Sequence, residues 1–291
     1  MITFTNIGNH GRLGNIMFQY AAVKSLANKL NCLPKFPPEL FDKIHHGQKC
    51  LINCFKLNCS FYSNDELINL NNFNEQYFCN GGHYTNEFWN CKENTNLSGH
   101  FESELYFENI IDGIKKEYEL KDEYKKYVVE YIENIKQKYP EHEIIGIHIR
   151  RGDYLNPQNG AEFITTTDYN KNYLNKALQE FTDNKKKVFI VFTGGSLEEN
   201  NNNSNDILWC KNNITEIIKD NIILFSENHS TIQDFGLMTL CDHLILNSSS
   251  TIGWWSAYLN INVNKKIIVP KGLGFKNDDT YWHSSYIQIT Y

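Results

Sequence analysis

Two adjacent arginines at the end of an apolar run have the clearest capacity for chemistry in this chain. The run covers 143–147 and leads into His148, Arg150, Arg151 and Asp153. A run of this kind predicts a buried strand, and alternation along a strand puts His148 and Arg150 on one face. Buried guanidiniums need an anionic partner, and two forked guanidiniums beyond a strand's carboxyl end suit a diphosphate.

An internal ion pair is the alternative interpretation, in which Arg151 binds Asp153 and only ties the turn. We disfavour it because the whole motif H-I-R-R-G-D-Y closes a predicted buried strand. Asp153 is also the carboxylate nearest the arginines, which makes it a candidate general base, with holding the turn as its alternative role. His148 is either a catalytic group or a satisfied strand residue.

Two further loops join a predicted strand to a predicted helix. The first, G-R-L-G-N at 11–15, has glycines for a tight turn and a helix N-terminus that offers N–H groups to an anion. In the second, Ser249, Ser250 and Thr251 could donate to phosphate or ribose oxygens, or could simply cap the helix. Neither a G-x-G-x-x-G loop nor the acidic residue that binds ribose about 20 residues on is present, which argues against the alternative of a nicotinamide enzyme.

Strands and helices must position these groups, and their alternation is regular after Pro140. Strands are expected at 143–150, 187–192, 222–225, 243–247 and 266–270, and helices near 169–181, 206–219, 230–241 and 253–259. This alternation predicts a parallel sheet covered by helices. Because a strand at 2–7 and a helix to residue 30 open the chain in the same way, we predict an α/β fold of two Rossmann-like domains facing each other across a cleft. The domains are expected at 1–140 and 141–291, with a charged helix at 122–139 near the boundary.

Composition excludes several classes of protein. The 291 residues carry a net charge of −6 and are 41% hydrophobic, so the chain can bury a core but lacks the basic surface of a nucleic-acid binder. Neither a signal peptide nor an apolar segment of membrane-spanning length is found, so we expect a cytoplasmic protein without a membrane span. The eight cysteines form no C-x-x-C pair, which disfavours zinc; free thiols are favoured over a disulfide-bearing N-terminal half.

Five ordered motifs together resemble the α-1,2-fucosyltransferases of glycosyltransferase family 11. They are GRLGNIMFQYA (11–21), SGHFESELYF (98–107), HIRRGDY (148–154), NDILWCKNNI (205–214) and DFGLMTLCDHLILNSSSTIGWWSAYL (234–259). H-x-R-R-x-D is shared with α-1,6-fucosyltransferases, and G-R-[LF]-G-N occurs in protein O-fucosyltransferases. The resemblance implies a GT-B architecture with GDP-fucose in the cleft, an acceptor-side first domain and a donor-binding second domain.

The resemblance also implies residue roles. Arg150 would bind the β-phosphate, with Arg151 and His148 supporting the nucleotide and the sugar. Asn15 and Arg12 would reach the pyrophosphate and the acceptor from the first domain. The other residues that it assigns to donor binding are Gly14, Asp206, Asp234, Ser249, Ser250 and Thr251.

The predicted reaction is an inverting transfer of L-fucose from GDP-β-L-fucose to a glycan hydroxyl. Arginines would stabilise charge on the departing phosphate, so no metal or other cofactor is expected, and no Asp-x-Asp motif is present. The family expectation for the acceptor is the 2-hydroxyl of a terminal galactose. Two alternatives stay open: another GDP-sugar or linkage, and a non-catalytic carbohydrate-binding protein.

Overall fold

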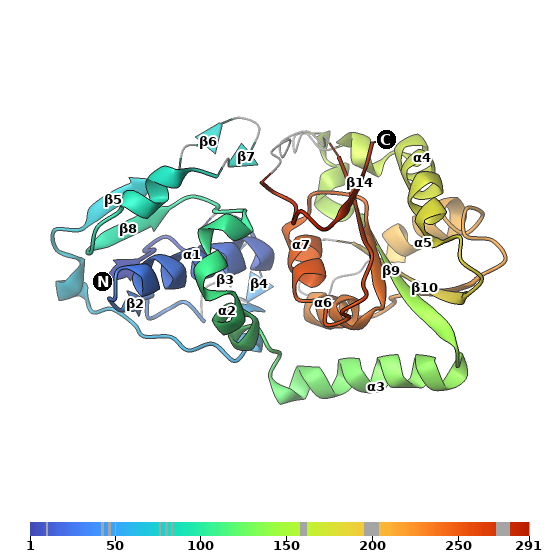
Figure 1. Ribbon diagram of the computed structural model, residues 1–291, viewed down its shortest axis with the longest axis horizontal. Coiled ribbons are helices and arrows are strands. Elements are labelled where there is room, and N and C mark those ends of the chain that lie inside the picture. Colours follow the sequence, from blue (N-terminus) through green and yellow to red (C-terminus); the bar gives the residue numbers. More distant parts are fainter. Residues whose placement is uncertain are drawn as a thin grey trace. The chain divides into compact units, whose positions relative to one another are not determined.

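The computed structural model describes residues 1–9, 11–41, 44–45, 48–49, 51–75, 77–78, 81–82, 84–157, 162–194, 204–271 and 280–290. The chain forms two compact units (Figure 1): Met1–Lys121 with Phe275–His283, and Asp122–Gly274 with Ser284–Tyr291. The expected boundary at residue 140 falls at the end of helix α3 (Asp122–Lys138), which belongs to the second unit. There α3 buries Val128, Ile132 and Ile135 and packs against helix α6 (Thr231–Leu240).

The second unit is built on a six-stranded parallel sheet with the order β11-β10-β9-β12-β13-β14. The strands are β9 (His142–Arg150), β10 (Lys186–Gly194), β11 (Ile222–Phe225), β12 (His243–Leu246), β13 (Ile267–Pro270) and β14 (Ile287–Ile289). In chain order this sequence reads 3-2-1-4-5-6, the order of dinucleotide-binding folds. The order reverses between β9 and β12, so the loops that follow these two strands flank the point where such folds bind ligands.

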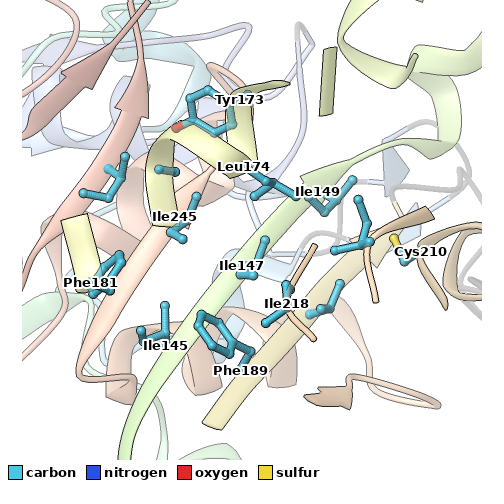
Figure 2. Packing of buried hydrophobic residues seen from close by; sticks show 14 of the residues in the cluster. Ile145, Ile147, Ile149, Tyr173, Leu174, Phe181, Phe189, Cys210, Ile218 and Ile245 are labelled. Carbon is cyan, nitrogen blue, oxygen red and sulfur yellow. The ribbon is translucent and has the colours of Figure 1, made fainter. Parts of the chain in front are cut away.

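Strand β9 lies inside the sheet between β10 and β12, and most of its residues are buried. Ile145, Ile147 and Ile149 lie in one apolar cluster with Tyr173 and Leu174 of helix α4 (Thr167–Leu178), as Figure 2 shows. Since side chains alternate along a strand, His148 and Arg150 belong to the opposite face. The predicted strand and its face assignment are therefore confirmed.

Three more α-helices accompany this sheet within the described residues: α5 (Ser204–Asn213), α6 and α7 (Thr251–Tyr258). Short 3₁₀ helices lie at Gly152–Leu155, Glu162–Thr165 and Gln179–Phe181. Helix α6 begins with the predicted capping box, in which Ser230 and Gln233 bind each other's backbone. Helix α5 is shorter than the predicted 206–219. It ends at Asn213 because the hydrogen bonds then change from the helical pattern, last made by Ile214 N–H to the Cys210 carbonyl (2.8 Å), to tighter turns such as Ile217 N–H to the Ile214 carbonyl (3.0 Å).

The first unit has a smaller parallel sheet with the order β2-β1-β8-β5. Its strands are β1 (Ile2–Thr3), β2 (Pro34–Lys35), β5 (Asn71–Asn74) and β8 (Thr95–Ser98). Helix α1 (Leu13–Lys29), buried along most of its length, packs against β1 and β2. The predicted strand at 2–7 is shorter than expected because the backbone turns after Thr3, where Ile7 N donates to the Phe4 carbonyl (3.1 Å).

The rest of the first unit is made of short pieces. They are helix α2 (Ile111–Glu117), the antiparallel pairs β3 (Ile44–His45) with β4 (Gln48–Lys49) and β6 (Tyr77–Phe78) with β7 (Gly81–Gly82), and 3₁₀ helices at Leu51–Cys54, Asn64–Leu67, Asn86–Asn90, Glu104–Tyr106 and Glu108–Ile110. Six cysteines are described and all are free thiols; Cys50 and Cys79 lie outside the described residues. No helix in the described part of the chain combines the length and the apolar character needed to span a bilayer.

Candidate functional site

Arg150, the last residue of β9, lies at the reversal point of the larger sheet. Its backbone N–H donates to Asn247 Oδ1 (2.8 Å), which ties the end of β9 to the loop after β12. Its side chain donates to the Gly194 carbonyl (3.0 Å) and to Asp153, and its guanidinium carbon lies 4.6 Å from the Tyr154 ring centroid. The side chain is 12% exposed. The guanidinium is thus oriented from several sides in a side chain that keeps some contact with solvent.

Asp153 pairs with Arg150, which corrects the internal alternative in which it would bind Arg151. The two residues lie three apart across the 3₁₀ turn Gly152–Leu155, a spacing that brings their side chains together. The first effect of this pair is to hold the guanidinium in place. The role of Asp153 as a general base stays a prediction.

Arg151 is enclosed, in contrast to its neighbour. Its Nε donates to Asp206 Oδ1 (3.0 Å), its Nη1 donates to the Thr165 carbonyl (2.9 Å), and its guanidinium lies 3.9 Å from the Trp209 ring centroid. Arg151 and Asp206 are 6% and 8% exposed. The pair therefore anchors α5 to the end of β9. A direct role in donor binding stays a prediction for both residues.

His148 lies on the same face of β9 as Arg150 and is 7% exposed. Within the described part of the chain its Nδ1 has no hydrogen-bond partner, and it lies so near Gly253 that a Cβ there would be 3.1 Å away. Burial first, and then the charge of Arg150, lowers the pKa of His148 to about 3. The imidazole is therefore neutral near pH 7 and adds no positive charge to the site.

This buried imidazole predicts an acid-dependent loss of stability. The unfolded chain protonates His148 near pH 6.5 and the folded chain only near pH 3. Between these values the unfolded state binds the extra proton, so stability falls as the pH falls, by about 1.4 kcal/mol per pH unit. Urea unfolding at pH 7 and pH 4.5 should show a smaller acid loss for His148→Asn than for the natural chain. Equal losses in both proteins would contradict the prediction.

The loop after β12 holds the predicted hydroxyl residues and one residue that sequence reasoning missed. Asn247 is fully buried: its Nδ2 donates to Asn170 Oδ1 (2.9 Å) and its carbonyl accepts the Tyr169 hydroxyl (2.6 Å). With the bond to Arg150, it fixes both loops at the reversal point. Its signal in the sequence is a polar residue that closes the apolar run HLILN.

The three hydroxyl residues lie at the start of helix α7. Ser249 and Thr251 are half-buried and Ser250 is buried. Ser250 is the N-cap, yet its side chain makes no capping hydrogen bond with the described residues. The alternative of ordinary capping is therefore not realised at Ser250. Donation to a phosphate or ribose stays a prediction for the loop.

Asp234 lies on α6 in a separate buried cluster. Ser226 donates to its Oδ1, and the His229 Nδ1 lies 3.6 Å from the same oxygen. Tyr127 of α3 meets the other imidazole nitrogen of His229 at 2.9 Å. Burial raises the pKa of Asp234. These contacts hold α3 and α6 together, and the predicted nucleotide contact of Asp234 stays a prediction.

The first unit contains the other predicted residues, at the start of α1. Gly11 has φ +86°, and its missing Cβ would lie 2.2 Å from Asn15 Cγ, so the Asn15 side chain occupies the space that only glycine leaves. Asn15 Oδ1 accepts the Arg12 N–H (3.2 Å). Arg12 is the half-buried N-cap, and Gly14 is buried inside the first helical turn. The predicted tight turn is present, and the helix starts at Leu13 within the motif.

A metal site has no support among the described residues, where no group of three or more His, Cys, Asp or Glu side chains is placed to hold an ion. Whether the reaction needs a metal stays a prediction.

Known proteins identify the family. The profile described as glycosyl transferase family 11 matches residues 2–282. The chain belongs to this family. Galactoside alpha-(1,2)-fucosyltransferase 2 of Sus scrofa is 26% identical over 86% of the chain, and galactoside 2-alpha-L-fucosyltransferase SEC1 of Bos taurus is 25% identical over 87%. The aligned regions span 67% and 63% of those relatives. The predicted family and the predicted class, glycosyltransferase, are confirmed.

Solved structures show the fold. POFUT1 in complex with GDP-fucose has a TM-score of 0.53 at 9% identity, with 92% of this chain and 97% of that chain covered. NodZ alpha-1,6-fucosyltransferase soaked with GDP-fucose has a TM-score of 0.50 at 12% identity, with 89% and 92% covered. With the parallel sheets, this confirms the predicted α/β fold of two Rossmann-like domains. Their arrangement across a cleft stays a prediction.

Proposed function

We propose that this chain transfers L-fucose from GDP-β-L-fucose to a glycan hydroxyl, with the 2-hydroxyl of a terminal galactose as the expected acceptor. The observation that carries the proposal is the position of Arg150, whose side chain is 12% exposed, at the reversal point of a 3-2-1-4-5-6 sheet. The names of the relatives support the fucosyl group and the α-1,2 linkage. The GDP-fucose in the solved structures of similar fold supports the donor.

In this proposal Arg150 acts on the leaving group. When the bond from fucose C1 to the phosphate oxygen breaks, its electron pair stays on GDP, and charge builds on the β-phosphate. A guanidinium held in place beforehand stabilises that charge without reorganising. Asp153 and the Gly194 carbonyl supply the orientation. Ser249 and Ser250 add donors for the phosphates and ribose.

The two arginines have separate tasks in the proposal. Arg151 is a positioning residue: through Asp206 it holds α5 against the end of β9 and so fixes the backbone next to Arg150. His148, being neutral, serves as a hydrogen-bond donor or acceptor and not as a cation. In this proposal the reaction needs no metal ion, because the guanidinium of Arg150 stabilises the charge on the leaving phosphate.

A panel of donors and acceptors tests the proposal on the full chain. GDP-fucose, GDP-mannose and UDP-galactose are offered with a β-galactoside and with its 2-O-methyl derivative, and the products are identified by mass spectrometry. We expect transfer only from GDP-fucose and only to the free 2-hydroxyl. Preference for GDP-mannose would contradict the donor, and transfer to the 2-O-methyl galactoside would contradict the linkage. Glycan binding without any transfer would favour a non-catalytic carbohydrate-binding protein.

A chelator provides the control for the metal. With excess EDTA, the rate of transfer should stay unchanged. A loss of transfer that magnesium or manganese restores would contradict the metal-independent reaction and leave the donor assignment intact.

A further inference from the structure

Helix α4 carries a buried polar side chain to which the proposed reaction gives no task. Asn170 is fully buried on the inner face of this helix, where the other buried residues are Tyr169, Tyr173, Leu174 and Ala177. Burying an amide costs free energy unless its donors and its acceptor find partners. The partners of Asn170 therefore indicate its role.

Asn170 forms hydrogen bonds on two sides. Its Nδ2 donates to the carbonyls of Ile164 and Thr166, both at 2.8 Å, so both N–H groups of the amide are used. Its Oδ1 accepts from Asn247 Nδ2 (2.9 Å). Asn247 in turn accepts the backbone N–H of Arg150 at its Oδ1 (2.8 Å). These bonds connect Arg150 to the start of α4 without a gap, and we call the five residues the Asn170 network.

The two ends of the Asn170 network fix its direction. A backbone N–H can only donate and a carbonyl can only accept. The amide of Asn247 must therefore turn its oxygen to Arg150, and the amide of Asn170 must turn its nitrogen to the carbonyls. If either amide were reversed, two donors or two acceptors would face each other. An ionised carboxylate at position 170 would lack the donors, and a leucine of similar size would satisfy neither side.

The turn that ends the network also binds Arg151. Its Nη1 donates to the carbonyl of Thr165 (2.9 Å), which lies between the two carbonyls that bind Asn170. This turn joins the 3₁₀ helix Glu162–Thr165 to the N-cap of α4, Thr166. Because the three carbonyls belong to consecutive residues, a shift of the turn changes the positions of both arginines together.

The network holds Arg150 from one side of its strand, and β10 holds it from the other. Strand β9 lies between β10 and β12. From β10, the Gly194 carbonyl accepts the Arg150 side chain (3.0 Å). From the loop after β12, Asn247 accepts the Arg150 backbone N–H, which sets the direction in which the side chain leaves the strand. A guanidinium that stabilises developing charge has to be in place before the reaction.

We propose that Asn170 is a positioning residue for the Arg150 guanidinium, because it ties the end of β9 to the turn that binds Arg151. This inference rests on the proposed function, in which Arg150 binds the β-phosphate of GDP-fucose. Being fully buried, Asn170 touches no substrate itself. A displacement of about 1 Å at a reacting group costs on the order of 10²-fold in rate, so a broken network slows transfer even in a folded chain.

Two substitutions each keep one half of the network. In Asn170→Ser the hydroxyl can donate to the carbonyl four residues earlier, that of Thr166, but the bond to Asn247 is lost. In Asn170→Asp the oxygen that accepts from Asn247 is kept, but the donors for the turn are lost. Tyr173→Phe is the matched control: it removes another hydrogen bond from the same helix, from the Tyr173 hydroxyl to the Leu246 carbonyl (2.7 Å), and leaves the network intact.

Each variant of the full chain is made alone and together with Arg150→Ala, and kcat for fucosyl transfer and Kd for GDP are measured. Alone, Asn170→Ser should lower kcat roughly 10–10²-fold and weaken GDP binding. In the Arg150→Ala background the same change should alter both quantities less than about threefold, because the guanidinium that it positions is already gone. Tyr173→Phe should change them less than about threefold in either background. Equal losses for Asn170→Ser in both backgrounds would mean that Asn170 only supports the fold, and would overturn the inference.

The outcomes separate this inference from the proposed function. A natural chain that moves no fucose refutes the proposed function itself, and the GDP affinities then still test the link between Asn170 and Arg150. An active natural chain whose Asn170→Ser variant keeps its kcat refutes only the positioning role. If Asn170→Ser is unfolded at the assay temperature, the same comparison is made with Asn170→Asp. Loss of the fold in both variants would assign Asn170 to stability alone and would also overturn the inference.

Discussion

Replacing Arg150 by alanine is expected to lower kcat for fucosyl transfer roughly 10²–10³-fold, the usual effect of removing one group that stabilises transition-state charge. The effect follows from position. Arg150 ends the central strand, lies at the reversal point of the sheet and has a side chain that is 12% exposed. Steady-state rates with GDP-fucose and a β-galactoside give the measurement, and GDP calorimetry shows the accompanying loss of affinity.

Two further variants make this result specific. Arg150→Lys keeps the charge but loses the fork that binds two oxygens, so it should recover only part of the rate. Lys125→Ala removes a cation from the exposed face of α3 and should leave the rate unchanged. Full activity in Arg150→Ala would refute the assignment of the phosphate contact. A collapse of the melting temperature would instead show that Arg150 acts through the fold.

The larger sheet could be predicted because its signals are local. Strands such as KVFIVF and HLILN are apolar runs bounded by polar turns, and the helices between them carry their own start signals, such as the capping box at Ser230. Strand alternation also predicted that His148 and Arg150 lie on one face. The alternation of strand and helix also predicted that the strands run parallel, whereas their order is known only from the structure.

The partners of the charged residues could not be predicted, because they depend on contacts between distant segments. Arg151 meets Asp206, 55 residues further along the chain, and nothing near the arginine indicates that its carboxylate comes from α5. Consecutive residues at the end of a strand point to opposite sides, so Arg150 and Arg151 diverge although the sequence suggests a pair. Asn247 was missed for a related reason: its three hydrogen bonds described above exist only after the sheet has formed.

The strands of the smaller sheet have only weak hydrophobic patterns in the sequence, so they could not be predicted well. Strand β1 has two residues, and β5 is the polar segment NNFN with three exposed residues, so neither shows a period. The contact between Asn15 and Glu102 could not be predicted, because the two residues lie 87 positions apart in the chain.

Of the substitutions predicted for this chain, Asp206→Ala is expected to lower the free energy of unfolding most. The change strips the buried Arg151 guanidinium of its carboxylate and leaves it with the Thr165 carbonyl and the Trp209 ring. Removing one partner of a buried ion pair lowers the free energy of unfolding by about 3–5 kcal/mol. In a unit of this size, such a loss lowers the melting temperature by on the order of 10 °C. Glu130→Ala, which breaks the solvent-exposed Lys126–Glu130 pair, should leave the melting temperature unchanged.

The double variant Arg151→Met with Asp206→Leu then separates structure from catalysis. Because apolar residues of similar size can replace a buried pair with little or no loss, its melting temperature should return close to that of the natural chain. If Arg151 only positions the end of β9, the stable double variant should keep fucosyl transfer within about tenfold. If Arg151 touches the donor itself, the rate should fall as far as it does in Arg150→Ala although the fold is restored. The second result would overturn its assignment as a positioning residue, because the loss of rate would then follow the missing charge and not the missing stability.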